Sequence, residues 1–183
     1  MEHGAPRVPV WDRPVRLLHW LLVGAVAAAW LTTLGLAGFH RAAGYGAAAI
    51  VVARIAWGFL GNRHARFSRF VLGPAATAAY AARVLAGREP RYLGHNPLGA
   101  WMVVALLACV AALGLTGWLY TSTDLFFGEP WLEDLHAILA WLLLGLIALH
   151  VAGVAFTSLR YRENLLRAMV DGAKPPPRGG DVG

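Results

Sequence analysis

The stretch Leu135–Leu159, LHAILAWLLLGLIALHVAGVAFTSL, decides the fold class of this protein. It carries no Asp, Glu, Lys or Arg, and it exceeds the roughly 20 apolar residues that a helix needs to cross a bilayer. Two histidines, His136 and His150, interrupt the apolar run. Because an ionisable side chain is costly inside a membrane, its presence there indicates a function.

Three more apolar stretches are long enough to be membrane helices, and they cover residues 15–38, 44–60 and 98–120. Together with residues 135–159 they predict an all-α protein, a transmembrane four-helix up-and-down bundle. The first stretch has an alternative, since Ala27–Ala29 resembles the processing site of a cleaved signal peptide. The apolar run continues past these alanines, which favours a retained helix.

The composition supports a membrane protein. Of the 183 residues, 58% are hydrophobic and only 14% are charged, against about 25% charged in soluble domains. The net charge of +6 is no sign of a nucleic-acid partner, because the basic residues avoid the apolar runs and so fit a role in membrane topology. The single cysteine, Cys109, excludes an internal disulfide, a covalent Cys-x-x-Cys-His haem site and an iron–sulfur site.

The loop charges predict an orientation. Basic residues gather in both termini and in residues 62–97, whereas residues 121–134 contain four acids and no Lys or Arg. The positive-inside rule therefore places both termini and the middle loop in the cytoplasm, as in a multi-pass membrane protein surrounded by lipid. Within the middle loop, Ala75–Leu85 predicts a short helix on the membrane surface, and Asn96-Pro97 predicts a helix start.

Residues 1–172 are expected to form one transmembrane domain. The rest of the chain, residues 173–183, contains Lys-Pro-Pro-Pro-Arg-Gly-Gly, a composition typical of a disordered tail.

Four of the seven histidines pair by depth in helices that alternate in direction. His136 and His150 are 14 residues apart, or about 21 Å along a helix. His150 should therefore lie at the inner level with His19, and His136 at the outer level with His40. Fourteen residues return to within roughly 40° of the same helix face, so both fourth-helix histidines can point into the bundle. The remaining histidines are His3 and His64, expected to be solvated, and His95.

Two imidazoles that face one another are suitable axial ligands for a six-coordinate haem iron. Two pairs at two depths predict two non-covalent bis-histidine haems, with His19, His40, His136 and His150 as the iron ligands and no catalytic residue. Zinc is the rival metal, but it would require a third protein ligand near each pair. For any single histidine, a hydrogen bond to a neighbouring helix is the alternative.

Arg54 follows His40 by the same 14 residues and should lie at the depth of His150. A buried cation needs an anion, for which a haem propionate is one candidate, and the alternative is an arginine that snorkels to the membrane surface. Small residues could make room for a flat macrocycle or could simply let helices approach closely; they are Gly114, Thr116, Gly117, Gly145 and Gly153.

Several motifs together resemble the bacterial cytochrome b561 and nickel-hydrogenase cytochrome b family over residues 8–172. They are VWDRPVRLLHW at 10–20, His40 followed by RIAWG at 54–58, GHNPLG at 94–99, LTG at 115–117, EDLH at 133–136 with His150, and RENL at 162–165. The resemblance implies a four-helix bundle with two haems b, one held by His19 and His150 and the other by His40 and His136. It also implies a quinone or propionate contact for His95.

The resemblance implies a respiratory-chain cytochrome of a bacterial inner membrane, which passes electrons between a quinone pool and a periplasmic partner such as a c-type cytochrome or another redox subunit. The shortness of the chain argues against the hydrogenase branch. One alternative on the same scaffold is a superoxide:quinone oxidoreductase. Alternatives of other classes are a proton channel or transporter that uses the histidines as a relay, and a haem-free anchor for a complex.

Overall fold

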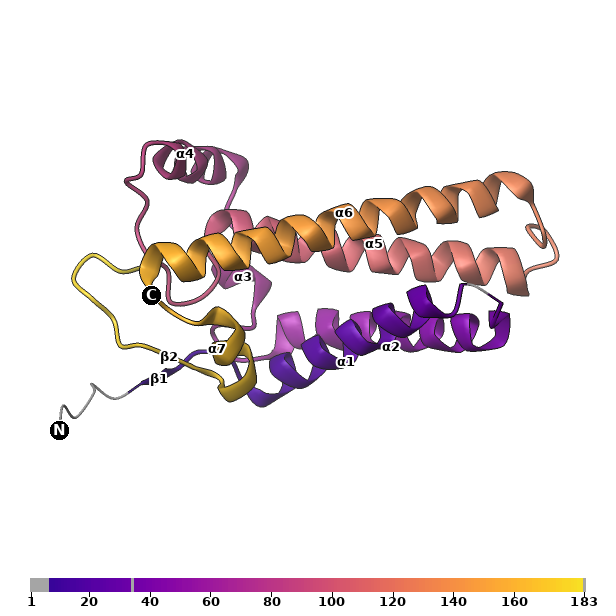
Figure 1. Ribbon diagram of the computed structural model, residues 1–183, viewed down its shortest axis with the longest axis horizontal. Helices are drawn as coiled ribbons and strands as arrows, with labels where there is room; N and C mark the ends of the chain where they lie inside the picture. The colour runs from indigo at the N-terminus through magenta and orange to yellow at the C-terminus, as the bar shows by residue number, and fades with distance from the viewer. Residues whose placement is uncertain (1–6, 34, 183) are drawn as a thin grey trace. The chain divides into compact units, whose positions relative to one another are not determined.

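The structure is a computed structural model that describes residues 7–33 and 35–182 (Figure 1). Four helices in these residues are long and apolar enough to span a membrane, which confirms the predicted four-helix transmembrane bundle. They are α1 (Arg13–Leu31), α2 (Ala37–Leu60), α5 (Pro97–Ser122) and α6 (Pro130–Tyr161). His3, expected to be a solvated residue, lies outside the described part of the chain.

Shorter elements lie between and after the four long helices. They are α3 (Phe67–Phe70), α4 (Pro74–Leu85), α7 (Leu165–Asp171), β1 (Val8–Pro9) and β2 (Ala173–Lys174). Helix α4 corresponds to the short helix predicted at Ala75–Leu85, and it begins at a proline, whose fixed φ suits the first helical turn. The location of α4 on the membrane surface stays a prediction.

The connection between the first two helices differs from the sequence prediction. Helix α1 ends at Leu31 instead of residue 38, and α2 begins at Ala37 instead of residue 44. The hydroxyls of Thr32 and Thr33 donate to carbonyls of the preceding turn, which closes α1 early. Gly35 then adopts a φ of 118°, a value that favours glycine over residues with a side chain. Apolar content alone could not locate this turn, because the residues on both sides of it are apolar.

Helix α5 starts where the sequence predicts. The Asn96 side chain accepts a hydrogen bond from the backbone N–H of Gly99 at 2.8 Å, and Pro97 is the first helical residue. Helix α6 begins at Pro130, five residues before the predicted residue 135, and carries Glu133 in its first turn. An acid at that position interacts favourably with the positive end of the helix dipole.

The chain forms two compact units. The helical unit comprises residues 17–56 and 104–149, and the terminal unit comprises the described residues of 1–16, 57–103 and 150–183.

The four long helices contact one another within the helical unit. Trp30 of α1 packs edge-on against Trp141 of α6, with ring centroids 5.5 Å apart. The Tyr45 hydroxyl of α2 lies 3.0 Å from the Ser122 hydroxyl of α5. Between α5 and α6, the Cys109 thiol donates to the Leu139 carbonyl at 3.4 Å.

The terminal unit joins the two ends of the chain. Strands β1 and β2 pair antiparallel, with Val8 opposite Lys174 and Pro9 opposite Ala173. Gly172, with a φ of 86°, ends α7, and its carbonyl accepts hydrogen bonds from the backbone of Val10 and Trp11. A Cβ at Gly172 would lie 2.7 Å from the Trp11 carbonyl oxygen, so only glycine fits this close approach.

The disordered tail predicted for residues 173–183 stays a prediction, and within this segment residues 175–182 make several contacts with Arg91 in the structure. The Arg91 guanidinium binds the Asp181 carboxylate and the carbonyls of Pro175 and Pro176, and Val182 donates its N–H to the Arg91 carbonyl. The Pro-rich composition of this segment predicts disorder, but its binding groups lie about 90 residues earlier in the chain. That pairing is not visible in the local sequence.

A buried ionic cluster holds this segment in place. The Arg91 guanidinium and the Lys174 ammonium both contact the Glu163 carboxylate, at 2.8 and 3.4 Å. Burial lowers the pKa of Lys174, and the nearby Glu163 carboxylate partly offsets this effect. Two cations against the two carboxylates of Glu163 and Asp181 leave the cluster neutral, as a buried ionic group requires.

Candidate haem site

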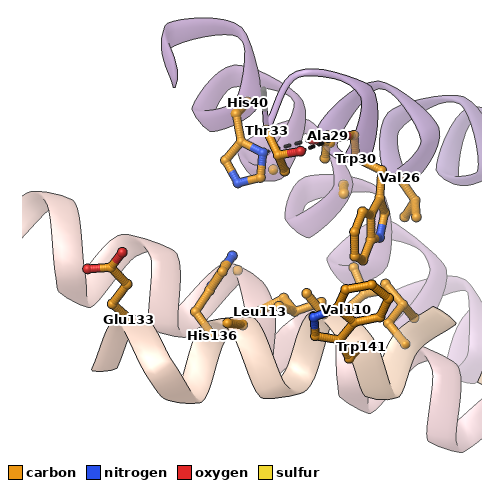
Figure 2. Close-up of a pocket in the computed structure, with 16 residues that line it drawn as sticks. Val26, Ala29, Trp30, Thr33, His40, Val110, Leu113, Glu133, His136 and Trp141 are labelled. Atoms are coloured by element: carbon orange, nitrogen blue, oxygen red, sulfur yellow. Dashed lines mark hydrogen bonds between the residues drawn. The ribbon is translucent and has the colours of Figure 1, made fainter. Parts of the chain in front are cut away.

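The candidate site is an apolar cavity of about 360 Å³ in the helical unit, within the roughly 300–1,000 Å³ typical of cofactor and ligand sites. His40 reaches it from the first turn of α2, and His136 reaches it from the second turn of α6. Figure 2 shows the two rings directed toward one another across the cavity. Both side chains are half-buried. The cavity brings together two of the four predicted iron ligands, from helices separated by most of the chain.

The hydrogen bond of His40 determines which of its nitrogens can bind a metal. Its Nδ1 lies 2.8 Å from the Ala29 carbonyl oxygen of α1 (Figure 2). A carbonyl only accepts hydrogen bonds, so Nδ1 must carry the proton. In a neutral imidazole the lone pair is then on Nε2, which is the form that a metal requires.

His136 has a matching partner in Thr116 of α5. Its Nδ1 lies 2.9 Å from Thr116 Oγ1. Thr116 Oγ1 also lies 2.9 Å from the carbonyl oxygen of Ala112 and 3.1 Å from that of Leu113, two acceptors for its hydroxyl proton. When the proton goes to one of these carbonyls, Oγ1 accepts from Nδ1–H and the lone pair of His136 is again on Nε2. Histidines that ligate metals commonly donate their second N–H in this way.

The distance between the two rings fits one metal ion between them. Their centroids are 6.1 Å apart, and their planes make an angle of 73°. Two imidazole nitrogens, each about 2 Å from a shared metal, place the ring centroids roughly 6 Å apart. Since the described residues contain no group of three or more His, Cys, Asp or Glu side chains that could hold a metal, a cofactor that supplies the equatorial ligands fits better than zinc.

The rest of the cavity suits a flat apolar cofactor. Its walls include Val26, Val110, Leu113 and the aromatic pair Trp30 and Trp141. Trp30 lines this site together with Trp141, as Figure 2 shows.

The small residues divide into two groups. A Cβ at Gly114 would lie 2.9 Å from the Ala48 Cβ, so this glycine permits close packing of α5 on α2. A Cβ at Gly117 would lie 3.4 Å from Cε1 of His136, so this glycine leaves room for the ring. Gly145 and Gly153 have no heavy atom of the described chain within 4 Å of such a Cβ. The packing explanation therefore holds for Gly114.

The other predicted site residues lie elsewhere on the long helices. His19, on α1 in the helical unit, packs edge-on against Trp20 with centroids 5.2 Å apart. His150, on α6, belongs to the terminal unit and is half-buried. The pairing of His19 with His150 stays a prediction. Arg54 is only 7% exposed, which argues against a snorkelling side chain in contact with solvent.

Sequence reasoning missed two contributors to the site. The sequence suggests Thr116 only as a small residue, whereas in the structure its hydroxyl orients His136. Glu133, which accepts a hydrogen bond from the Tyr120 hydroxyl at 3.0 Å, lines the cavity one helical turn before His136. The sequence does carry a signal for Glu133, because residues three apart on a helix, such as Glu133 and His136, lie on the same face. No comparable signal connects Thr116 to a histidine 20 residues later.

Comparison with known proteins supports a haem protein. The family described as "Prokaryotic cytochrome b561" matches residues 10–172. This range includes all four predicted histidine ligands and excludes most of the Pro-rich segment that follows α7. No solved structure matches the chain.

Several curated relatives carry the name "Probable Ni/Fe-hydrogenase B-type cytochrome subunit". The one from Bradyrhizobium diazoefficiens is 24% identical over 93% of this chain and 87% of its own length. Those from Azotobacter chroococcum and Cupriavidus necator are each 27% identical, over 90% and 89% of this chain and 87% and 85% of their own lengths. The shortness of this chain is therefore no reason to exclude the hydrogenase branch.

Proposed function

Because this chain belongs to the prokaryotic cytochrome b561 family, and so is a membrane b-type cytochrome that transfers electrons, we propose that it carries them through two haems b. His40 and His136 hold one haem, and His19 and His150 hold the other. The electrons pass between a membrane quinone and a redox partner outside the membrane. Both termini face the cytoplasm of a bacterial cell, and the cavity between His40 and His136 lies toward the periplasm.

The observation that carries this proposal is the matched state of the two rings. Each donates its Nδ1 proton to a fixed acceptor, and each presents Nε2 to a shared cavity with the centroids 6.1 Å apart. The bound iron supplies one-electron chemistry. When haem is bound, the chain would supply the two imidazole nitrogens that hold the iron, keep the rings in place through Ala29 and Thr116, and surround the group with mostly apolar side chains.

Burial of Arg54 supports a second role for the chain. A guanidinium on a membrane helix requires an anionic or strongly polar neighbour, and Arg54 is buried on α2. We assign it to a haem propionate, whose negative charge it would neutralise. Charge neutralisation of this kind stabilises the bound cofactor and raises its reduction potential.

The redox partner follows from the relatives. Several are named as cytochrome subunits of Ni/Fe-hydrogenases, so a hydrogenase is the first partner to test, and a c-type cytochrome is the second. Superoxide oxidation is less well supported, because the exposed Glu133 carboxylate lines the cavity and would repel an anionic substrate.

Anaerobic mixing of the purified, haem-loaded chain with a reduced short-chain quinol tests this function. We expect the α-band absorbance of reduced low-spin haem to rise, and His136→Leu to lose part of that signal. Arg83→Gln, which changes an exposed residue outside the four long helices, should behave as the wild type does. Haem that the quinol cannot reduce would contradict the quinone link, and a colourless preparation would favour a histidine-relay channel or a structural anchor.

A further inference from the structure

A second cavity lies in the terminal unit, and none of its lining residues is a predicted iron ligand. Its volume is about 150 Å³, too small for a macrocycle, given that cofactor sites usually exceed roughly 300 Å³. Arg63 and His64 follow α2, Arg69 lies in α3, and His95 precedes α5; these four side chains contribute to the lining. Four basic or titratable side chains from three segments therefore converge on a space that suits one compact group.

The charge of this cavity is one-sided. No carboxylate is among its lining residues. In the part of the chain that the structure describes, neither Arg63 nor Arg69 forms an ion pair with an acidic side chain. Lys174, whose charge is balanced by Glu163, lies near the carbonyl of Tyr92 in the cavity wall at 3.5 Å. Two guanidiniums without a carboxylate partner form a site that attracts an anion.

The floor of the cavity is rigid. The His95 ring packs between Phe70 and Trp11, with centroid distances of 4.5 and 4.7 Å. The backbone of Gly94 approaches the His64 ring so closely that a Cβ there would lie 3.3 Å from Nδ1. Aromatic packing of this kind fixes the position of the imidazole without the help of a ligand.

The pKa of His64 is consistent with the positive charge of the cavity. Its pKa is lowered, first by burial and then by the cations Arg63 and Lys174. An anion bound in the cavity would offset the last two effects.

The cavity also lies at the level where a membrane helix begins. Leu72, on its rim, accepts a hydrogen bond from the indole of Trp101 at 3.1 Å, and Trp101 is in the second turn of α5 and partly exposed. Tryptophans at such positions mark the headgroup region of the bilayer. Clusters of Arg and Lys at this level attract anionic phospholipids.

We propose that this cavity binds a phosphate group, and that the phosphate is supplied by an anionic phospholipid of the leaflet in which α5 begins. Arg63 and Arg69 contact the phosphate oxygens, and His64 lies beside them. The acyl chains extend along the apolar surface of α5. The proposal does not depend on either haem, because no lining residue is a predicted iron ligand.

The test measures lipid binding to the full, haem-loaded chain in a neutral detergent. Native mass spectrometry counts bound phosphatidylglycerol during a titration, and the thermal midpoint Tm is followed in parallel. Phosphatidylcholine and inorganic phosphate are titrated separately. For the wild type, we expect one tightly bound phosphatidylglycerol and a rise in Tm that neither other compound reproduces at equal phosphate concentration.

The variant Arg63→Gln/Arg69→Gln should weaken this binding by roughly 30-fold, since two basic contacts are lost. All four arginines are exposed. The matched control, Arg83→Gln/Arg88→Gln, removes the same charge from positions of the same loop that do not line the cavity, and it should retain the tight site. If the double variant of the cavity folds poorly, the single variants Arg63→Gln and Arg69→Gln should each weaken binding by about fivefold.

Three results would overturn the proposal. Equal losses in the cavity variant and its control would show only a general surface charge. An equal effect of inorganic phosphate would rule out lipid as the source. A shift in the haem spectrum of the cavity variant with lipid binding unchanged would assign the two arginines to a haem propionate instead.

Discussion

Two acceptors, the Ala29 carbonyl and the Thr116 hydroxyl, give the histidines of the cavity their function. The histidine side chain alone does not determine its tautomer, because either ring nitrogen can carry the proton. The sequence predicts His40 and His136 as a pair from their depth alone. It could not predict the tautomer, since that depends on hydrogen bonds to α1 and α5, elements far away in the sequence.

The variant Thr116→Val tests this orientation. Loss of the acceptor for Nδ1–H should weaken haem binding at His136 by about 10- to 100-fold, as other changes to the partners of metal ligands do. Haem titration of the stripped protein measures the effect. The control is Thr123→Val, because Thr123 also donates to the carbonyl four residues earlier but touches no histidine in the described structure. Unchanged haem affinity in Thr116→Val would show that the hydroxyl does not orient the ring.

Asp171 illustrates a residue whose effect depends on pH. Hydrogen bonds from Arg7, and then from the Ala173 N–H, lower the pKa of this carboxyl from 3.8 to about 2. A lowered pKa contributes stability that is fully present above pH 3.8 and is lost as the pH falls toward 2. The Tm of Asp171→Asn should therefore lie below that of the wild type at pH 7, and the gap should shrink as the pH falls below 4. A gap independent of pH would contradict this account.

At the scale of single elements, local sequence signals were reliable where a cap or a proline marks the boundary. Asn96-Pro97 predicts the start of α5, and the structure confirms it. The boundary between α1 and α2 could not be predicted from composition, because threonine back-bonding and the φ of Gly35 end α1 within an apolar run. The strand that follows α7 could not be predicted from its local sequence either, since β2 pairs with residues at the opposite end of the chain.

Removal of the α5 cap should have a measurable cost. Asn96→Ala leaves the N–H of Gly99 without its acceptor, and we expect the free energy of unfolding to fall by about 1 kcal/mol. Chemical denaturation in detergent, followed by circular dichroism, measures the change. Asn96→Ser retains a capping oxygen and should lie within a few tenths of a kcal/mol of the wild type. Equal stabilities for Asn96→Ala and the wild type would exclude a role for the cap.

Alanine substitutions at two glycines, Gly114 and Gly145, test whether α2 packs closely on α5. Gly114→Ala introduces a Cβ 2.9 Å from the Ala48 Cβ, and overpacking of this kind typically costs about 1–3 kcal/mol. Gly145→Ala meets no described atom within 4 Å, and alanine favours a helix over glycine by up to about 1 kcal/mol. We therefore expect a lower Tm for Gly114→Ala and an equal or higher Tm for Gly145→Ala. The reverse order would contradict the packing of α2 on α5.

At the scale of the whole molecule, the length of the apolar stretches predicts four membrane helices and the structure confirms them. Their orientation is a prediction from loop charge. Cysteine variants Cys109→Ser/Leu85→Cys and Cys109→Ser/Leu125→Cys place a single thiol at an exposed position of the middle loop or of the acidic loop. In intact cells, a membrane-impermeant thiol reagent should label the second variant and not the first. Labelling of Leu85→Cys alone would reverse the proposed topology.

Haem content measures the central claim most directly, that His40 and His136 ligate the same iron. The wild type should contain about two haems per chain by pyridine haemochromogen assay. His40→Leu and His136→Leu should each lose one haem, and the double variant should lose no more than either single variant. If the double variant instead lost both haems while each single variant lost one, or if His40→Leu retained the full haem content, the two histidines would not share an iron.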